Sequence, residues 1–163
     1  MTKYYIFRHG ETFYSKNRQS YPEDNFLVEI LPEEIPVLEK LAIYLKNISS
    51  DYNVSSEYFR CQQSIKIVSE ISRLHFENDS RLNEFNHETF EELVKRLENF
   101  VKDIEEKNYS TVIICSHGAV IAGLKNILTG SEFESRELIN YPKTGILTCI
   151  EDKKIEEVDF NKP

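Results

Sequence analysis

The sequence lacks the long apolar runs that membrane proteins and secreted precursors carry. No stretch approaches the ~20 consecutive apolar residues that cross a bilayer. The apolar run near the N-terminus, Tyr4–Phe7, is too short for a signal peptide, and no small-residue cleavage site follows it. These absences argue against a membrane-spanning or secreted protein, and we expect the protein to be cytoplasmic.

Cysteine is also scarce, with three residues in the whole chain: Cys61, Cys115 and Cys149. Their number is odd and their spacing is wide, which favours neither a disulfide framework nor a zinc site. We therefore predict three reduced thiols. No metal-ligand spacing occurs elsewhere in the chain.

Positively charged residues are outnumbered, with 20 Lys and Arg against 28 Asp and Glu, and the formal net charge is −8. This balance opposes general attraction to nucleic acid or to an anionic membrane, although a local group of cations can still hold a small anion. We expect no nucleic-acid or membrane partner. Any phosphate site must be concentrated and local.

Linkers and repeats are missing too. No Gly/Ser-rich or Pro-rich segment, low-complexity stretch or internal repeat divides the 163 residues. A chain of this length suits one ordinary domain, which buries well over half of its unfolded surface. Residues 1–163 are therefore predicted to form a single domain.

The chain does contain two kinds of apolar segment, and these alternate. Five short segments have the composition of strands: residues 4–7, 53–55, 111–115, 145–150 and 155–160. The last two, joined by four polar residues, predict a hairpin at the sheet edge. The apolar runs at 4–7 and 111–115 suit central strands covered on both faces. The alternation with helices predicts an α/β fold.

Four longer stretches space their apolar residues for one helix face. They cover residues 38–48, 65–74, 90–104 and 120–128. Pro32 or Pro36 lies in the first turn of the first helix. Thr89 with Glu92 predicts a capping box for the third, and Gly130 is expected to end the fourth.

Two histidines follow the two most apolar strands at the point where each strand ends. His9 lies in Arg8-His9-Gly10-Glu11-Thr12, and His117 lies in Ser116-His117-Gly118. The carboxyl ends of parallel strands share one rim, where open α/β sheets bind ligands. His117 and Gly118 also open a helix, whose free amides favour an anion. Taken singly, each histidine is better explained as a capping or packing residue, so the prediction depends on their coincidence.

Arg60 begins the helix that follows the short strand at 53–55. The helix dipole disfavours a cation at this end, and a bound phosphate would explain an arginine there. A surface arginine is the alternative, and for Arg60 considered alone it is the better explanation.

Together these motifs resemble those of the phosphoglycerate mutase-like histidine phosphatases. Four matches occur in the family's order: Arg8-His9-Gly10-Glu11-Thr12, Ser56 through Arg60 to Ser64, Leu82-Asn83-Glu84, and Ser116-His117-Gly118. The resemblance covers most of the chain and weakens after Gly118. It implies a three-layer α/β/α sandwich with a mostly parallel central sheet.

The resemblance also implies a role for each matched position. His9 would be phosphorylated, while Arg8, Arg60 and His117 would bind the phosphate, with Gly118 beside them at the helix start. Guanidinium forks match phosphate oxygens and offset their charge, so a neutral imidazole can attack phosphorus. Because these groups supply the electrostatic stabilisation, no metal or other cofactor is implied.

Glu84 takes the proton-transfer role in the resemblance, first as general acid toward the leaving alkoxide and then as general base toward water. A solvated turn carboxylate that supports a helix N-terminus is the alternative interpretation, and it is what we expect of Glu88, Glu91 and Glu92. Glu88 remains a second candidate for the proton donor.

Two positions depart from the family pattern. Ser15 stands where the family usually has Asn, and Glu88 stands in a turn where it often has Gly. Both departures leave the substrate open. Thr12, Ser15 and Arg18 are candidates for contacting the phosphate or the leaving group, and polar loop residues facing water are an equally good reading of each.

The predicted activity is metal-independent hydrolysis of a small phosphorylated substrate through a phosphohistidine. Mutase members of the family carry a cap or insertion, whereas one predicted helix and one strand fill most of the chain between Glu84 and His117. We therefore expect an open pocket, which favours water as the phosphoryl acceptor. A phosphoglycerate mutase and an inactive phospho-ligand-binding module are the alternatives. Substrate identity and oligomeric state stay open.

Overall fold

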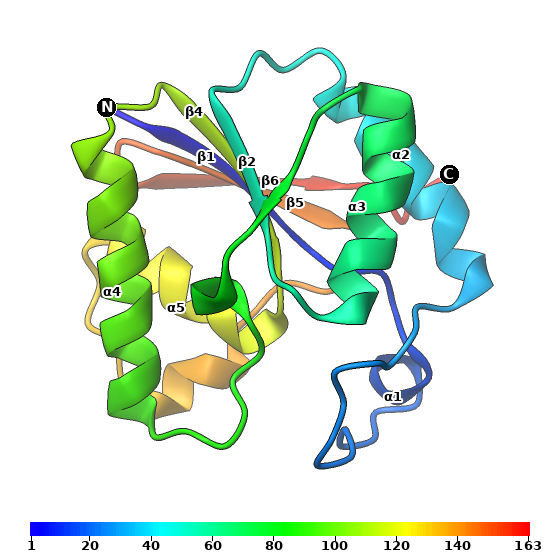
Figure 1. Cartoon of the computed structure of the whole chain (residues 1–163), viewed down its shortest axis with the longest axis horizontal. Coiled ribbons are helices and arrows are strands. Elements are labelled where there is room, and N and C mark those ends of the chain that lie inside the picture. The colour runs from blue at the N-terminus through cyan, green and yellow to red at the C-terminus, as the bar shows by residue number, and fades with distance from the viewer.

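The computed structural model describes residues 1–163 and contains one six-stranded sheet, in the order β3-β2-β4-β1-β5-β6 (Figure 1). The strands are β1 (Lys3–Arg8), β2 (Tyr52–Ser55), β3 (Glu77–Asn78), β4 (Thr111–Ser116), β5 (Ile146–Glu151) and β6 (Lys154–Asp159). The first four run parallel, while β5 is antiparallel to both β1 and β6. The predicted mostly parallel α/β fold is confirmed.

Helices cover both faces of the sheet (Figure 1). One layer contains α2 (Ile35–Leu45) and α3 (Phe59–Ser72), and the other contains α4 (Phe90–Glu106) and α5 (Gly118–Thr129). Alternate residues of the central strands enter the two cores, because successive side chains of a strand point to opposite faces. Ile6 packs with α4 and α5, whereas Tyr5 and Phe7 pack with α2 and α3.

Local signals account for most of these helices. The stripe at 90–104 becomes α4, and the Thr89 hydroxyl caps it by accepting from the Glu92 amide at 3.1 Å. Gly130 ends α5 with a φ of 70°. Pro32 opens a short 3₁₀ turn (Pro32–Glu34) that leads into α2. The first two helices end sooner than their apolar spacing predicted.

The C-terminal hairpin has a tighter turn than predicted. Glu151 pairs with Lys154 inside the ladder, so only Asp152 and Lys153 form the turn, with φ values of 50° and 62°. Two consecutive residues with positive φ match a type I′ turn, whose twist fits a two-residue hairpin. Neither residue is Gly, which is why the sequence did not indicate the turn.

The carboxyl ends of β1, β2 and β4 meet at one edge of the sheet. Arg8 at the end of β1 lies opposite Ser116 at the end of β4, and Ser55 of β2 lies opposite Cys115. Beyond this carboxyl edge, the chain continues from β1 into the short helix α1 (Phe13–Lys16) and an irregular segment leading to α2 (Figure 1). None of the helices has the length and apolar character needed to cross a membrane.

Candidate active site

His9 leaves the end of β1 and is completely buried. Its Nδ1 lies 2.7 Å from the carbonyl oxygen of Gly10. Because a carbonyl can only accept, Nδ1 carries the proton and Nε2 keeps its lone pair. Arg60 Nε donates to that Nε2 at 3.3 Å, which agrees with this tautomer. The free ring nitrogen of His9 therefore faces a guanidinium group.

His117 leaves the end of β4, opens α5 and is also completely buried. Its ring centroid lies 5.2 Å from that of His9, so the two predicted histidines do meet. Its Nε2 lies 2.8 Å from the Ser56 hydroxyl at the end of β2. Its Nδ1 has no hydrogen bond, although the nearest carboxylate oxygen of Glu84 is 3.4 Å away.

Arg60 is the second residue of α3, and none of its surface is exposed. Its terminal nitrogens donate to the Asn25 carbonyl oxygen at 2.7 Å, to Asn25 Oδ1 at 3.1 Å and to Glu84 Oε2 at 3.1 Å. The ring of Tyr21 stacks 4.4 Å from the guanidinium carbon. A buried charge is tolerated only with such partners, so the surface reading of Arg60 is wrong.

Arg8, the last residue of β1, has a different environment from that of Arg60. Its guanidinium lies 5.0 Å from the ring centroid of Tyr141, and its buried Nε has no hydrogen-bond partner. Gly118 makes room for this ring, because a Cβ at Gly118 would lie 2.7 Å from a Tyr141 carbon. A buried N–H without a partner is costly, and an anion beside Arg8 would satisfy it.

Glu84 lies inside the cluster, between Arg60 and His117. Arg96 of α4 holds the turn that carries it, donating to the carbonyl oxygens of Asn83 at 2.9 Å and of Glu84 at 3.3 Å. Glu88 instead accepts from Arg96, with an ion pair of 2.8 Å, and contacts neither histidine. The geometry therefore favours Glu84 over Glu88 as the proton carrier.

The surroundings keep both histidines neutral. Burial lowers the pKa of His9 well below the ordinary value of 6.5, and the charges of Arg8 and Arg60 lower it further. Burial likewise lowers the pKa of His117 well below 6.5, with additional effects from His9, Arg60 and Arg8. A neutral imidazole with a free lone pair is the form that can act as a nucleophile.

None of the three candidate loop residues forms a hydrogen bond with either histidine. The Thr12 hydroxyl caps α1, accepts from the Ser15 amide at 3.2 Å and lies 2.8 Å from the hydroxyl of Tyr21. Ser15 completes this capping box. Arg18 is exposed and has a φ of 53°. Thr12 and Ser15 thus shape the loop, and Arg18 faces solvent.

The chain closes over these groups, contrary to the expected open pocket. We call residues 21–25 the covering segment, because Tyr21 and Asn25 both contact Arg60. Its Asn25 is buried and occupies two terminal nitrogens of Arg60. Together with the stacked Tyr21 ring, this contact shields the cluster from solvent. No local sequence signal predicts this closure, because its contacts join residues more than thirty positions apart.

Comparison with known families agrees with the geometry. The family model described as histidine phosphatase superfamily (branch 1) matches residues 4–87 and 85–159. The chain belongs to the histidine phosphatase superfamily. A search of curated protein sequences finds no match.

Solved structures resemble this chain over nearly its whole length. The alpha-ribazole phosphatase from Shigella flexneri has a TM-score of 0.79 at 19% identity, covering 99% of this chain and 96% of that one. The phosphoglycerate mutase from Bacillus anthracis has a TM-score of 0.73 at 16% identity, covering 98% and 93%. A mycobacterial glucosyl-3-phosphoglycerate phosphatase in complex with VO3 has a TM-score of 0.78 at 17% identity, covering 97% and 96%. At these low sequence identities, the structural similarity establishes a shared fold and no more.

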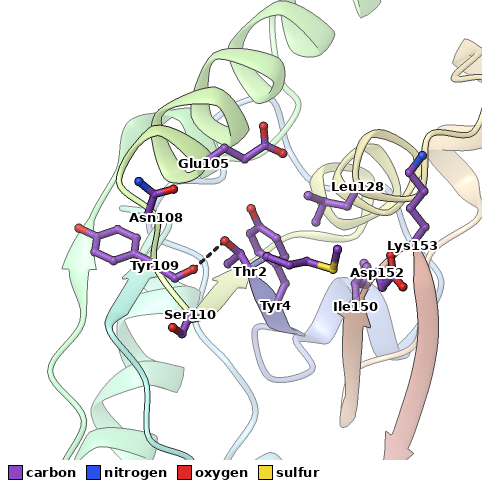
Figure 2. A pocket seen from close by; sticks show the side chains of 11 residues that line it. Thr2, Tyr4, Glu105, Asn108, Tyr109, Ser110, Leu128, Ile150, Asp152 and Lys153 are labelled. Carbon is purple, nitrogen blue, oxygen red and sulfur yellow. Dashed lines mark hydrogen bonds between the residues drawn. The ribbon is translucent and has the colours of Figure 1, made fainter.

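A pocket of about 490 Å³ lies at the opposite edge of the sheet (Figure 2). It lies between the ends of α4 and α5 and the β5–β6 turn, where the Thr2 hydroxyl donates to the Tyr109 carbonyl at 2.7 Å. Burial and the charge of Glu105 raise the pKa of Tyr4 there to about 12. This pocket contains no histidine or arginine, so the histidine phosphatase motifs lie elsewhere.

No cluster of three or more His, Cys, Asp or Glu side chains is placed to hold a metal ion. The three cysteines are buried free thiols, as predicted. Burial raises the pKa of Cys115 well above 9.0, which keeps this thiol protonated. Cys61 Sγ approaches His117 Nε2 at 3.6 Å, so it packs directly behind the histidine pair.

Proposed function

We propose that the protein hydrolyses phosphate monoesters through a covalent phosphohistidine on His9, without a metal ion. The tautomer of His9 carries this proposal. His9 Nδ1 lies 2.7 Å from the Gly10 carbonyl oxygen, which keeps the proton on Nδ1. The lone pair on Nε2 is therefore available, and it lies beside the Arg60 guanidinium, which attracts anions. A capping or packing histidine would not require a buried arginine against that nitrogen.

In the first step the Nε2 lone pair attacks phosphorus. The bond between phosphorus and the ester oxygen breaks, its electron pair goes to the leaving alkoxide, and Glu84 protonates that oxygen. The second step returns a proton to Glu84, so the carboxyl group ends the cycle as it began it. Arg8, Arg60 and His117 offset the charge on the phosphoryl oxygens.

In the second step Glu84 accepts a proton from water, whose oxygen attacks the phosphoryl group. The P–N bond breaks and its electron pair returns to His9 Nε2, which restores the starting tautomer. Phosphoryl transfer demands mainly alignment and charge stabilisation, and both arginines and His117 supply these. One carboxylate thus serves both half-reactions.

Substrate entry requires movement of the covering segment. Asn25 holds the nitrogens of Arg60 that a phosphate would use. We propose that the substrate phosphate replaces the two Asn25 oxygens, which carry only partial negative charge and therefore bind a guanidinium more weakly. The substrate is a small phosphorylated compound, and residues 1–163 act as a single cytoplasmic domain without a cap insertion.

A phosphoglycerate mutase-type transfer is the second candidate, and the covered site favours it. A phosphohistidine shielded from water lives longer, which allows transfer to another hydroxyl group. Coupled measurement of 2- and 3-phosphoglycerate interconversion separates this activity from hydrolysis, because only hydrolysis releases inorganic phosphate.

The main test is release of inorganic phosphate from a panel of phosphorylated metabolites and p-nitrophenyl phosphate. We expect turnover that survives exhaustive chelation by EDTA, and competitive inhibition by vanadate. Loss of activity with EDTA that one divalent ion restores would show that a metal supplies the charge. No turnover of any ester would support an inactive phospho-ligand-binding module.

A further inference from the structure

Two hollows open beside Arg8 on the outer side of the candidate site. Their volumes are about 390 and 450 Å³, and both are lined by Arg8, Ser15, Arg18 and Tyr141. Lys16 and Lys143 also line the first hollow, and Glu11 is the only acidic residue there. We call the pair the basic mouth. In a chain with a net charge of −8, this local excess of cations is unusual.

The basic mouth is continuous with the groups that would hold the scissile phosphate. Arg8 lines both hollows, and its buried Nε has no partner. Tyr21 lines the second hollow while its ring stacks on Arg60 at 4.4 Å. A phosphate on Arg8 and Arg60 would therefore leave its ester oxygen close to the mouth once Tyr21 moves with the covering segment.

The hollow on the other side of the covering segment has the opposite character. Its volume is about 380 Å³, and it is lined by Glu23, Asp24 and His87 together with Asn25 and three further residues. None of Arg8, His9, Arg60, Glu84 or His117 reaches it. An anionic leaving group would be repelled there and attracted to the basic mouth.

Two cations of the basic mouth have no partner within the chain. Arg18 and Lys143 are exposed, and neither has a carboxylate within 4.0 Å, whereas Lys16 lies 4.0 Å from Glu33. Arg18 also adopts a φ of 53°, a conformation that disfavours residues with a Cβ. Arg18 and Lys143 are therefore free to bind an anion.

We propose that the leaving group of the substrate carries a second anionic group, a carboxylate or a phosphate, which binds Arg18 and Lys143 in the basic mouth. This inference rests on the proposed function of the same site. It narrows the substrate from any phosphate monoester to one with two separated negative groups. Monoesters with neutral or cationic leaving groups are poor substrates.

The test compares small alkyl phosphates that differ chiefly in the group distant from the scissile phosphate. Glycerol 3-phosphate, whose distant group is uncharged, is the reference. 3-Phosphoglycerate replaces its terminal hydroxymethyl group by a carboxylate, and glycerol 1,3-bisphosphate carries a second phosphate there. Phosphoethanolamine supplies a cation. We expect kcat/KM, read as inorganic phosphate release, to be about tenfold higher than for glycerol 3-phosphate with at least one compound that carries a second anionic group, mainly through KM. Which of the two is preferred identifies the second group.

The double variant R18Q/K143Q should remove this preference. Its kcat/KM for the preferred compound should be close to its kcat/KM for glycerol 3-phosphate. The matched control K95Q/K102Q removes two exposed charges from α4 and should keep the preference. Equal kcat/KM for all four compounds in the wild type, or an unchanged preference in R18Q/K143Q, would overturn the proposal. Calorimetric binding of the same compounds measures the preference even if none is hydrolysed, so failure of catalysis and failure of the basic mouth are distinguishable.

Discussion

The two edges of the sheet differ in what they bury. At the carboxyl edge His9, Arg60 and His117 are all completely buried. The two hollows of the basic mouth beside them have volumes of about 390 and 450 Å³. At the amino edge a pocket of about 490 Å³ is larger than either hollow of the basic mouth, yet it contains no buried charged group. Burying charge is costly, so a protein retains it where it serves a function. Between these two edges, the larger hollow is therefore not the one beside the buried arginine and histidines.

The two edges also differ in their buried polar atoms that lack a hydrogen-bond partner. At the carboxyl edge Arg8 Nε and His117 Nδ1 both lack hydrogen-bond partners and lie beside the same candidate phosphate site. At the amino edge the Tyr4 hydroxyl is the single such atom among the residues that line the pocket. If function is confined to the carboxyl edge, substitutions there should lower turnover and substitutions at the amino edge should not.

The largest expected effect is that of His9→Ala. Removing a nucleophile that works with its neighbours as a unit lowers kcat by about four orders of magnitude or more. Tyr4→Phe, at the other edge, should leave kcat within about twofold of the wild type, since Tyr4 lies far from the chemistry. Steady-state hydrolysis of p-nitrophenyl phosphate measures both. Substantial activity in His9→Ala would mean that another group attacks phosphorus.

The next largest effect separates two carboxylates of the carboxyl edge. Glu84→Gln should slow alkyl phosphate hydrolysis by about a hundredfold, because a poor leaving group needs a general acid. Formation of the phosphoenzyme from p-nitrophenyl phosphate, with its good leaving group, should be much less affected.

Glu88→Gln is the matched control, since Glu88 pairs with Arg96 and reaches neither histidine. It should change hydrolysis of both esters by the same small factor. If Glu88→Gln shows the leaving-group dependence while Glu84→Gln resembles the wild type, the proton carrier has been assigned to the wrong carboxylate.

A smaller effect concerns stability. The pKa values of His9 and His117 lie well below 6.5 in the folded chain, so below about pH 6.5 the unfolded chain binds more protons. Acidification through this window should therefore lower the free energy of unfolding, by up to about 1.4 kcal/mol per pH unit for each histidine. Urea denaturation at a series of pH values measures this slope.

His117→Gln should reduce that slope by the contribution of one histidine. Glu34 acts in the opposite direction, because burial raises its pKa above 4.5 and its contribution is lost as the pH rises. The variant retains Glu34, so the difference between the two slopes isolates His117. Identical slopes would mean that His117 titrates normally in the folded protein.

The smallest expected effect is at the amino edge. Tyr4→Phe removes a buried hydroxyl without a hydrogen-bond partner, so the free energy of unfolding should stay unchanged or rise by up to about 1 kcal/mol. Denaturant unfolding at neutral pH measures it. A clear loss of stability would indicate that the Tyr4 hydroxyl does have a hydrogen-bond partner. The residues that line the amino-edge pocket would then contain no unpartnered buried polar atom.

Sequence reasoning predicted the elements and residues that depend on local signals. The strands at 4–7 and 111–115 are continuous apolar runs, and a histidine at the end of each was enough to place both on one rim. The helix at 90–104 followed from its apolar period and from Thr89. Such features need only a few neighbouring residues to be recognised.

Contacts between distant segments could not be predicted in this way. Asn25 and Tyr21 cover Arg60 from a loop with no apolar periodicity. Arg96 reaches the Glu84 turn from α4, whose sequence shows only the usual apolar stripe of an amphipathic helix. The strand Glu77–Asn78 has only two residues and is defined by pairing with β2. Each of these depends on tertiary packing, which overrides local propensity.

The most direct test of the central claim is the identity of the residue that is phosphorylated during turnover. Brief incubation with labelled substrate, denaturation and peptide mapping should place the phosphoryl group on His9, in a form stable to alkali and labile to acid, as expected of a phosphoramidate. Label that is stable to acid, label on another residue, or no label in an enzyme with a kinetic burst would contradict the account.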